Sequence, residues 1–420
     1  MRRAFRWWLA AAGVSLAAGC GDGGPVTGPI TQLPRDLTAS ESRLVATDND
    51  LTFRLLRAIA DRASPNSNLF ISPLSIAMAL GMTYNGAAGT TQAAMQSALG
   101  LDALSLGEIN RSYRGVIDLL RGLDPRVDFT LANSIWYRRG FAFEASFLDS
   151  CRTYFDASVQ GLDFTSPGAA PAINQWVSDQ TRGKIPSIVP DPVPSDVVMY
   201  LINAVYFKGT WVTQFDRNRT VPGPFTLADR SSMSVPMMSF AGEGWVRTGA
   251  DAAVTVLDLR YGGGAYSMTI VMPRDPAGMD SLVAGLSGER WNAWIAGLDS
   301  QRAHVVMPKF KLAYRVRMND VLAALGMGVA FVPCDQVASD CADFTRMRTV
   351  RDLFVTEVLH KTFVDVNEEG TEAAAATSVG VGTTAAPAAL VIDRPFVFAI
   401  RERFSGTILF VGRMMNPAAS

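Results

Sequence analysis

Apolar and polar positions follow two periods along the chain, and these periods predict helices and strands in mixed order. Phe53, Leu56 and Ala60 recur at helical spacing, which predicts a helix over residues 43–61. The same spacing predicts helices at 75–84, 91–99, 145–154, 173–180 and 318–325, with a turn at Asn85-Gly86 after the first of these. Runs of β-branched and aromatic residues predict strands at 127–136, 198–208, 254–261 and 265–272, and over most of the last 30 residues. The pattern indicates an α+β domain with antiparallel sheets.

Residues 367–387 differ from the rest of the chain because they combine a charged start with a long run of small residues. They carry no helical stripe, which is typical of an exposed loop. With a period of two, Thr371, Ala373, Ala375 and Thr377 fall on one side and Glu372, Ala374 and Ala376 on the other. This pattern predicts a strand thin enough to slip between other strands. Composition alone also allows a low-complexity linker.

The segment around this loop closely resembles the hinge motif of serpins, in LFVTEVLHKTFVDVNEEGTEAAAAT at 353–377. Two later segments, 394–402 and 406–417, resemble the C-terminal strands of that family. Three earlier motifs fit in the expected order: NLFISPLSI at 68–76, INQWV with TRGKI between 173 and 185, and LINAVYFKGTW at 201–211. Six separated motifs in register make chance a poor explanation, so the chain is identified as resembling the serpin family over its whole globular length.

The resemblance implies the serpin fold, with about eight or nine helices around three mainly antiparallel β-sheets and an exposed reactive-centre loop at about 368–392. It implies a suicide-substrate inhibitor of serine proteases, which traps the acyl-enzyme by inserting this loop into the central sheet. It also assigns residues to three regions of that mechanism. These are a hinge (Glu368, Glu369, Gly370, Thr371, Glu372, Ala373, Ala374, Ala375, Ala376 and Thr377), a shutter (Ser72, Ser75, Asn203 and His360) and a breach (Trp211).

The scissile bond is placed by counting along the loop from both ends. Fourteen residues after Gly370 and eleven before Pro395 both lead to Thr384, so the expected bond is Thr384–Ala385. A β-branched, uncharged residue suits the small or shallow apolar pocket of elastase- or subtilisin-like enzymes. Shifts to Val381, Ala385 or Ala386 stay open, as does a papain-like cysteine protease as the target.

Two other classes of function compete with protease inhibition. A non-inhibitory member of the family, acting as a binding or chaperone protein, often has proline or bulky charged residues in its hinge, whereas this hinge has Gly370, Thr371 and four alanines. An enzyme is the third reading. The two histidines, His304 and His360, form no H-E-x-x-H pair, and no G-x-S-x-G elbow occurs. We therefore expect an inhibitor, with no cofactor and no metal.

The ends of the chain and its charge bear on location and partners. Residues 1–20 resemble an export signal, and LAAGC at 16–20 resembles a bacterial lipobox with lipid on Cys20. A glycine-rich tether at 21–42 and a single domain at 43–420 follow. We expect a monomer held in the bacterial envelope, at the periplasm or cell surface, with a secreted protein as the alternative. The formal charge of −1 and the lack of a basic run argue against nucleic acid.

Three further cysteines lie in the predicted domain. Cys334 and Cys341 stand seven apart in a polar loop, and a disulfide between them is plausible in an exported protein. Cys151 shares a helical face with Phe147 and Phe155, which favours a buried apolar role.

Overall fold

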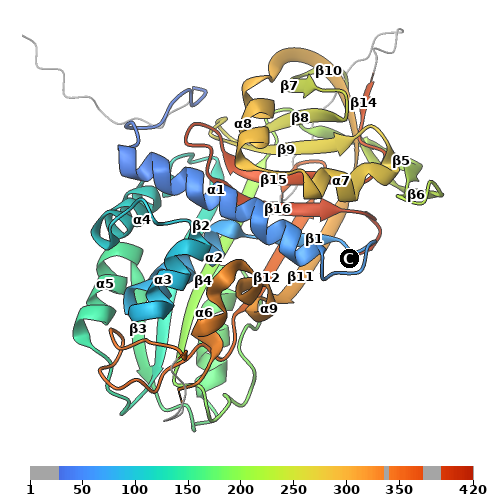
Figure 1. The fold of residues 1–420 in the computed structure, drawn as a ribbon. Coiled ribbons are helices and arrows are strands. Elements are labelled where there is room, and N and C mark those ends of the chain that lie inside the picture. Colours follow the sequence, from blue (N-terminus) through green and yellow to red (C-terminus); the bar gives the residue numbers. More distant parts are fainter. Residues whose placement is uncertain (1–27, 335–339, 372–388, 420) are drawn as a thin grey trace, which may run out of the picture.

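The computed structural model describes residues 28–334, 340–371 and 389–419. Within them lie nine α-helices, and most of these lie against the β-sheets (Figure 1). Their bounds are α1 (Ala39–Ala60), α2 (Pro73–Gly86), α3 (Gly89–Leu99), α4 (Leu106–Leu120), α5 (Ala145–Phe155), α6 (Ala169–Gln180), α7 (Met279–Ala284), α8 (Gly288–Ala296) and α9 (Asn319–Leu322).

Sixteen strands form the sheets of the described residues. Their bounds are β1 (Leu69–Ile71), β2 (Val127–Arg138), β3 (Ala157–Leu162), β4 (Met199–Thr210), β5 (Phe215–Thr226), β6 (Ser232–Phe240), β7 (Gly244–Ala250), β8 (Val254–Tyr261), β9 (Tyr266–Pro273), β10 (Asp299–Pro308), β11 (Phe310–Arg317), β12 (Leu359–Val366), β13 (Gly370–Thr371), β14 (Ala389–Val391), β15 (Phe396–Glu402) and β16 (Ile408–Met414).

One sheet has six strands in the order β11-β12-β13-β4-β2-β3. The other ten strands form a continuous path, β1-β16-β15-β9-β8-β7-β10-β6-β5, with β14 beside β10. The long strand β10 divides this path, because residues 299–303 pair with β7 and residues 306–308 pair with β6. The strands therefore form three sheets, two of them joined through β10, and only the β2–β3 and β10–β14 pairs are parallel. The predicted α+β class with three mainly antiparallel sheets is confirmed.

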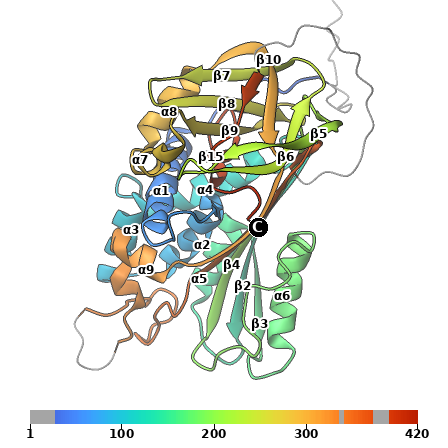
Figure 2. The same cartoon turned by 90° about the vertical axis from the view of Figure 1, so that its right-hand side faces the viewer.

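Helices cover both faces of the six-stranded sheet, with α6 on one face and α2 and α5 on the other (Figure 2). Under α6 a separate apolar cluster joins Ile173 and Val177 to Trp136 and Ile202 of the sheet. On the opposite face α2 is buried over nearly all of its length. It begins where the Ser72 hydroxyl caps the Ser75 N–H and Pro73 takes the first turn, a position that needs no donor. The sheet is thus enclosed between two layers of helix.

Two boundaries differ from the sequence predictions. The predicted turn at Asn85-Gly86 is wrong, because α2 continues through both residues. The Asn85 amide donates to the Gly81 carbonyl and to Asn110 Oδ1, so a buried amide pair holds this end as helix. The predicted tether at 21–42 is also too long. Helix α1 already begins at Ala39, and Ile30 packs against the core.

Candidate functional site at the hinge of the six-stranded sheet

The hinge residues Gly370 and Thr371 lie inside the six-stranded sheet as the short strand β13. Gly370 is opposite Thr210 and Thr371 is opposite Gly209 of β4, while Thr371 is also opposite Val366 of β12. A Cβ atom on Gly370 would overlap the carbonyl oxygen of Gly209. Only glycine therefore allows the backbones to approach so closely, and the start of the loop is already held between two strands.

The side chain of Thr371 points into the protein and is 2% exposed. Its hydroxyl lies 2.6 Å from the Tyr261 hydroxyl at the end of β8. The Tyr261 ring stacks on Trp211 with centroids 4.3 Å apart. Trp211 in turn donates from its ring N–H to the Asn367 carbonyl (2.9 Å) and from its backbone N–H to the Glu369 carbonyl (2.8 Å). The structure therefore brings the predicted breach residue Trp211 into contact with the predicted hinge.

Two buried glutamates fix the chain just before β13. Glu368 accepts hydrogen bonds from Lys309 Nζ (2.9 Å) and from the Thr220 hydroxyl (2.8 Å). Burial alone would raise the pKa of the Glu368 carboxyl, but the hydrogen bonds from Lys309 and Thr220 outweigh it and hold that pKa below its usual range. Glu369 pairs with Arg217 of β5. The predicted hinge is thus tied by charge to β5 and to the residue between β10 and β11.

The four predicted shutter residues lie together beneath the middle of the sheet. The backbone N–H of Ser72 donates to His360 Nε2 at 2.9 Å, and the Ser75 hydroxyl donates to the Asn203 carbonyl at 3.4 Å. Asn203 also donates from its amide to Asn133 Oδ1 at 2.8 Å. Burial lowers the pKa of His360 to about 4, so its imidazole is neutral at pH 7. Helix α2 therefore joins β4 to β12 across a gap in the sheet.

A cavity of about 320 Å³ occupies this gap. Its walls come from residues 199–205 of β4, from 352–362 on the β12 side, and from side chains of the segment between residues 185 and 198. β13 covers only two residues, and among the described residues no other strand pairs with the facing edges of β4 and β12. The cavity lies between β4 and β12, beyond the residues of these strands that pair with β13.

Several predicted residues lie elsewhere. Cys20, the scissile pair Thr384 and Ala385, and the hinge residues 372–377 are outside the described residues. Cys334 and Cys341 form a disulfide, with Cα atoms 5.0 Å apart. Cys151 is buried, and burial raises the pKa of its thiol to about 12. His304 lies on β10 with Nε2 3.0 Å from the Ser239 hydroxyl, away from the hinge.

Sequence reasoning missed several residues that contact the hinge and the shutter. These are Asn133 of β2, Tyr261 of β8, Arg217 and Thr220 of β5, and Lys309 between β10 and β11. Of these residues, Asn133 was the one that sequence reasoning could most easily have identified, because a polar amide within the apolar strand 127–136 needs a buried partner. The charged partners of Glu368 and Glu369 lie more than 50 residues away and carry no local signal.

The described residues contain no group of three or more His, Cys, Asp or Glu side chains placed to hold a metal ion. In this part of the chain no helix has the length and apolarity that crossing a bilayer requires.

Comparisons with known proteins agree with this geometry. A family model described as Serpin (serine protease inhibitor) matches residues 46–417. Human neuroserpin is 34% identical over 365 residues, which cover 84% of this chain and 87% of that protein. Leukocyte elastase inhibitor from Sus scrofa is 34% identical over 389 residues, which cover 89% of this chain and 100% of that protein.

Solved structures give the same result for the fold. The thermophilic serpin tengpin, in its native state, matches with a TM-score of 0.79 and 28% identity, covering 93% of this chain and 97% of that one. Human thyroxine-binding globulin in complex with thyroxine matches with a TM-score of 0.80 and 28% identity, covering 90% and 100%. Since the family model spans most of the chain and relatives exceed 30% identity over more than four-fifths of it, this chain belongs to the serpin (serine protease inhibitor) family.

Proposed function

We propose that this chain is a suicide-substrate inhibitor of serine proteases that cleave after small, uncharged residues. The protease serine attacks the Thr384 carbonyl, the peptide bond to Ala385 breaks, and Thr384 becomes an ester of the enzyme. The loop on the N-terminal side of the cut then adds to the six-stranded sheet as a new strand. Loop insertion in serpins is an established case of strand addition. The rest of the proposal depends on whether this sheet can accept this loop.

The observation that carries the proposal is the register of β13. Thr371 is opposite Gly209 on one side and opposite Val366 on the other. Six residues further on, the same registers would place Thr377 opposite Asn203 on β4 and opposite His360 on β12. Both positions belong to the shutter and line the cavity. The Oδ1 atom of Asn203 is buried and has no hydrogen-bond partner among the described residues. An inserted Thr377 hydroxyl would supply one.

The length of the insert explains the trapping. Residues 371–384 number fourteen and span about 46 Å as a strand at roughly 3.3 Å per residue. A protease joined to Thr384 is carried that distance and pulled against the protein, which distorts its active site. Losing one oxyanion donor alone slows acyl transfer about 10²–10³-fold. The acyl-enzyme therefore persists.

Target choice rests on Thr384. A β-branched, uncharged side chain enters a small or shallow apolar pocket, as elastase- and subtilisin-like enzymes have, and cannot satisfy a pocket built for a basic residue. The relative from Sus scrofa carries the name leukocyte elastase inhibitor, which supports the same class of target.

The test mixes the purified chain with a panel of elastase-, subtilisin-, trypsin- and papain-like proteases and looks for an SDS-resistant complex. Thr371→Arg puts a charge where a 2% exposed hydroxyl meets Tyr261, and an unpaired buried charge costs several kcal/mol. We expect this variant to be cleaved at the same bond without forming the complex, so that the inhibitor becomes a substrate.

Thr371→Val is the matched control, because it keeps the side-chain shape and loses only the hydroxyl. It should lose a small part of the inhibition. If Thr371→Arg forms as much complex as the wild type, insertion is not the mechanism. If no protease forms a complex with the wild type, the alternative of a non-inhibitory binding or chaperone protein takes its place.

We also propose that the mature chain is anchored in a bacterial envelope through lipid on Cys20. The support is the LAAGC sequence followed by a glycine-rich segment. Mass spectrometry of the mature N-terminus should find diacylglycerol on Cys20, and an unmodified N-terminus at another residue would contradict the anchor.

A further inference from the structure

The first residues that the structure describes, 28–38, begin beside the hairpin between β8 and β9. The backbone N–H of Ile30 donates to the Gly263 carbonyl of this hairpin at 2.8 Å, and the Ile30 side chain packs on the core. Arg126 Nη2 donates to the Gly28 carbonyl at 3.2 Å. These contacts fix the place on the domain where residue 28 lies.

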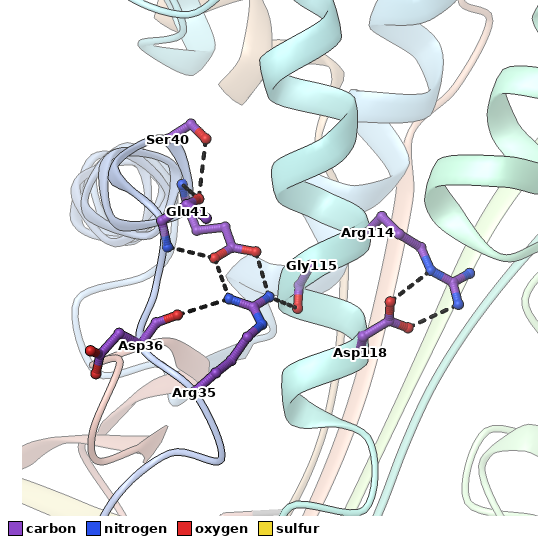
Figure 3. A network of polar contacts seen from close by, with 8 residues as sticks. Arg35, Asp36, Ser40, Glu41, Arg114, Gly115 and Asp118 are labelled. Atoms are coloured by element: carbon purple, nitrogen blue, oxygen red, sulfur yellow. Dashed lines mark hydrogen bonds and ion pairs between the residues drawn. The ribbon is translucent and has the colours of Figure 1, made fainter.

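The same segment is also held farther along, where it reaches α1. Figure 3 shows the Arg35 guanidinium between the Glu41 carboxylate of α1 and the Gly115 carbonyl of α4. Both Arg35–Glu41 hydrogen bonds measure 2.7 Å, and Glu41 is itself buried. Because the segment is fixed at both ends, Gly28 has a defined position on the domain.

The proposed lipid on Cys20 lies a short way before this position. Cys20 and Gly28 stand eight positions apart in the sequence, and eight residues reach at most about 29 Å. A domain of this length has a radius of gyration of roughly 20 Å and is therefore about 50 Å across. A membrane that holds lipid on Cys20 is thus restricted to the side of the domain that carries Gly28.

Three arginines surround the hairpin on this side. A Cβ atom on Gly263 would lie 2.8 Å from Arg126 Nη2. A Cβ atom on Gly264 would lie 3.8 Å from Arg403 Nη1 and 3.9 Å from Arg260 Cδ. Within the described part of the chain, no ion pair joins any of the three guanidinium groups to a carboxylate. The end of the sheet therefore carries a group of positive charges.

Buried carboxylates balance this positive charge only in part. Asp124 is buried and accepts the Gly263 N–H at 2.7 Å, so its carboxylate serves the hairpin backbone. Burial lowers the pKa of the Arg403 guanidinium, the charge of Asp258 raises it, and neighbouring arginines, Arg260 among them, lower it again. The arginines therefore repel one another, and an anion at the surface would relieve this repulsion.

Exposed apolar side chains continue the surface from Arg260 toward β7. Val212 is 52% exposed, and its N–H donates to the Arg260 carbonyl at 2.9 Å. Trp245, at the start of β7, is 60% exposed, and no other tryptophan of the described residues is exposed. A Cβ atom on Gly244 would lie 2.5 Å from Thr213 Cγ2, so the two exposed side chains follow residues that touch.

The strand itself determines the direction of the tryptophan. Val246, the next residue, is buried, so the period of two turns Trp245 to the outer face of the sheet. Arg302 lies opposite Trp245 on β10 and pairs with Glu243 at 3.7 Å, which adds no net charge. An exposed indole beside unpaired arginines is typical of a surface that meets a membrane, because the ring suits the headgroup level and the guanidinium groups attract anionic lipids.

From this arrangement we propose that the surface lies on the anionic phospholipid headgroups of the membrane that holds the chain. It is here named the hairpin face and consists of Arg126, Val212, Trp245, Arg260 and Arg403. The inference rests on the proposed lipid on Cys20 and adds an orientation to it. Since Tyr261, two residues before Gly263, contacts Thr371, the start of the reactive-centre loop lies near the hairpin face.

The experiment measures binding of residues 21–420 to lipid vesicles by co-sedimentation. This chain keeps every described residue and lacks the proposed lipid, so its binding reports the protein surface alone. We expect it to bind vesicles of phosphatidylglycerol and phosphatidylethanolamine, less tightly as salt rises, and to bind phosphatidylcholine vesicles more weakly. Trp245→Ala should weaken binding to the anionic vesicles about tenfold, because the indole no longer leaves water. Arg126→Gln should weaken it about fivefold.

Arg346→Gln and Val350→Ala are the matched controls. Both side chains are exposed in the segment between α9 and β12, which Figure 2 shows at the opposite end of the molecule from β7. Both variants should bind the anionic vesicles as the wild type does, and equal melting temperatures show that every variant is folded.

Three results would overturn the proposal. These are equal binding to anionic and phosphatidylcholine vesicles, wild-type binding by Trp245→Ala, and an equal loss of binding in the two controls. Failure of the lipid anchor is recognised separately, because mass spectrometry would then find Cys20 unmodified. Binding of residues 21–420 to anionic vesicles in that case would still support the hairpin face.

Discussion

At the scale of single residues, the candidate site contains buried polar side chains, most of whose polar atoms are hydrogen-bonded. His360 is the clearest case, since it is 6% exposed and accepts a hydrogen bond from the Ser72 N–H. That bond requires the neutral imidazole with its proton on Nδ1. Protonation would remove the acceptor and leave a charge beneath the sheet, so His360 makes the shutter sensitive to acid.

This sensitivity gives a prediction about pH. Burial lowers the pKa of His360 from 6.5 to about 4, so the unfolded chain binds the proton more readily. The contribution of neutral His360 to the free energy of unfolding is fully present above pH 6.5 and is lost as the pH falls toward 4. The loss approaches about 3 kcal/mol at 1.36 kcal/mol per unit. Denaturant unfolding of the wild type and of His360→Gln across this range measures it.

The difference between the two proteins is the informative quantity, because other groups titrate in the same range. Burial raises the pKa of Asp48 to about 7, which changes stability in the opposite direction. This contribution is common to both proteins and cancels. If the wild type and His360→Gln lose stability in parallel between pH 6.5 and 4, His360 is not the acid-sensitive residue.

A second prediction at this scale concerns Thr384. Thr384→Arg should weaken inhibition of elastase-like enzymes and create inhibition of trypsin-like ones, because the basic side chain fits the acidic pocket of the latter. Paired inhibition rates for one enzyme of each kind measure the exchange. Thr383→Arg, one residue away, is the control and should not produce it. A cleaved fragment whose N-terminus never falls near Ala385 would contradict the placement of the bond.

At the scale of elements, the pattern of the sequence predicted the strands at 127–136 and 198–208 and the hairpin at 254–272 to within two residues. These segments are long, and the pattern of apolar and polar side chains within each segment indicates which positions are buried. The end of α2 was missed because an amide pair with Asn110, 25 residues away, satisfies Asn85 inside a helix. Helix α4 and the docking of residues 28–38 were missed for the same kind of reason. Their positions depend on partners distant in sequence.

The candidate site shows the same difference between features that local pattern predicts and features that depend on residues distant in sequence. The motifs predicted a hinge, a breach residue (Trp211) and a shutter, and the structure has Trp211 in contact with the predicted hinge and the Thr371 side chain buried. Local pattern did not reveal that Gly370 and Thr371 are already paired with β4, and Thr371 also with β12. That depends on the fit of a glycine backbone against Gly209 and on a hydroxyl pair with Tyr261. Such contacts arise only when three strands and a hairpin have been assembled.

At the scale of the whole molecule, the structure has an unfilled space within the six-stranded sheet. The cavity between β4 and β12 measures about 320 Å³. Filling this space with a strand buries the apolar part of its walls, which is favourable. New strand pairing on both edges adds to this. If the loop inserts as proposed, this free energy is released only then, and the uncleaved form would persist because conversion is slow.

Cleavage at Thr384–Ala385 would free the N-terminal part of the loop to insert, and this should raise the melting temperature of the protein. At about 2 °C per kcal/mol for a large domain, a gain of several kcal/mol would raise it by about 10 °C. Calorimetry of intact and cleaved wild type measures it, with cleaved Thr371→Arg as the control. That variant has the same cut but cannot bury residue 371, so its melting temperature should stay near that of the intact chain. An equal rise in both cleaved proteins would show that cutting the loop, rather than inserting it, stabilises the fold. No rise in either would mean that the sheet does not accept the loop.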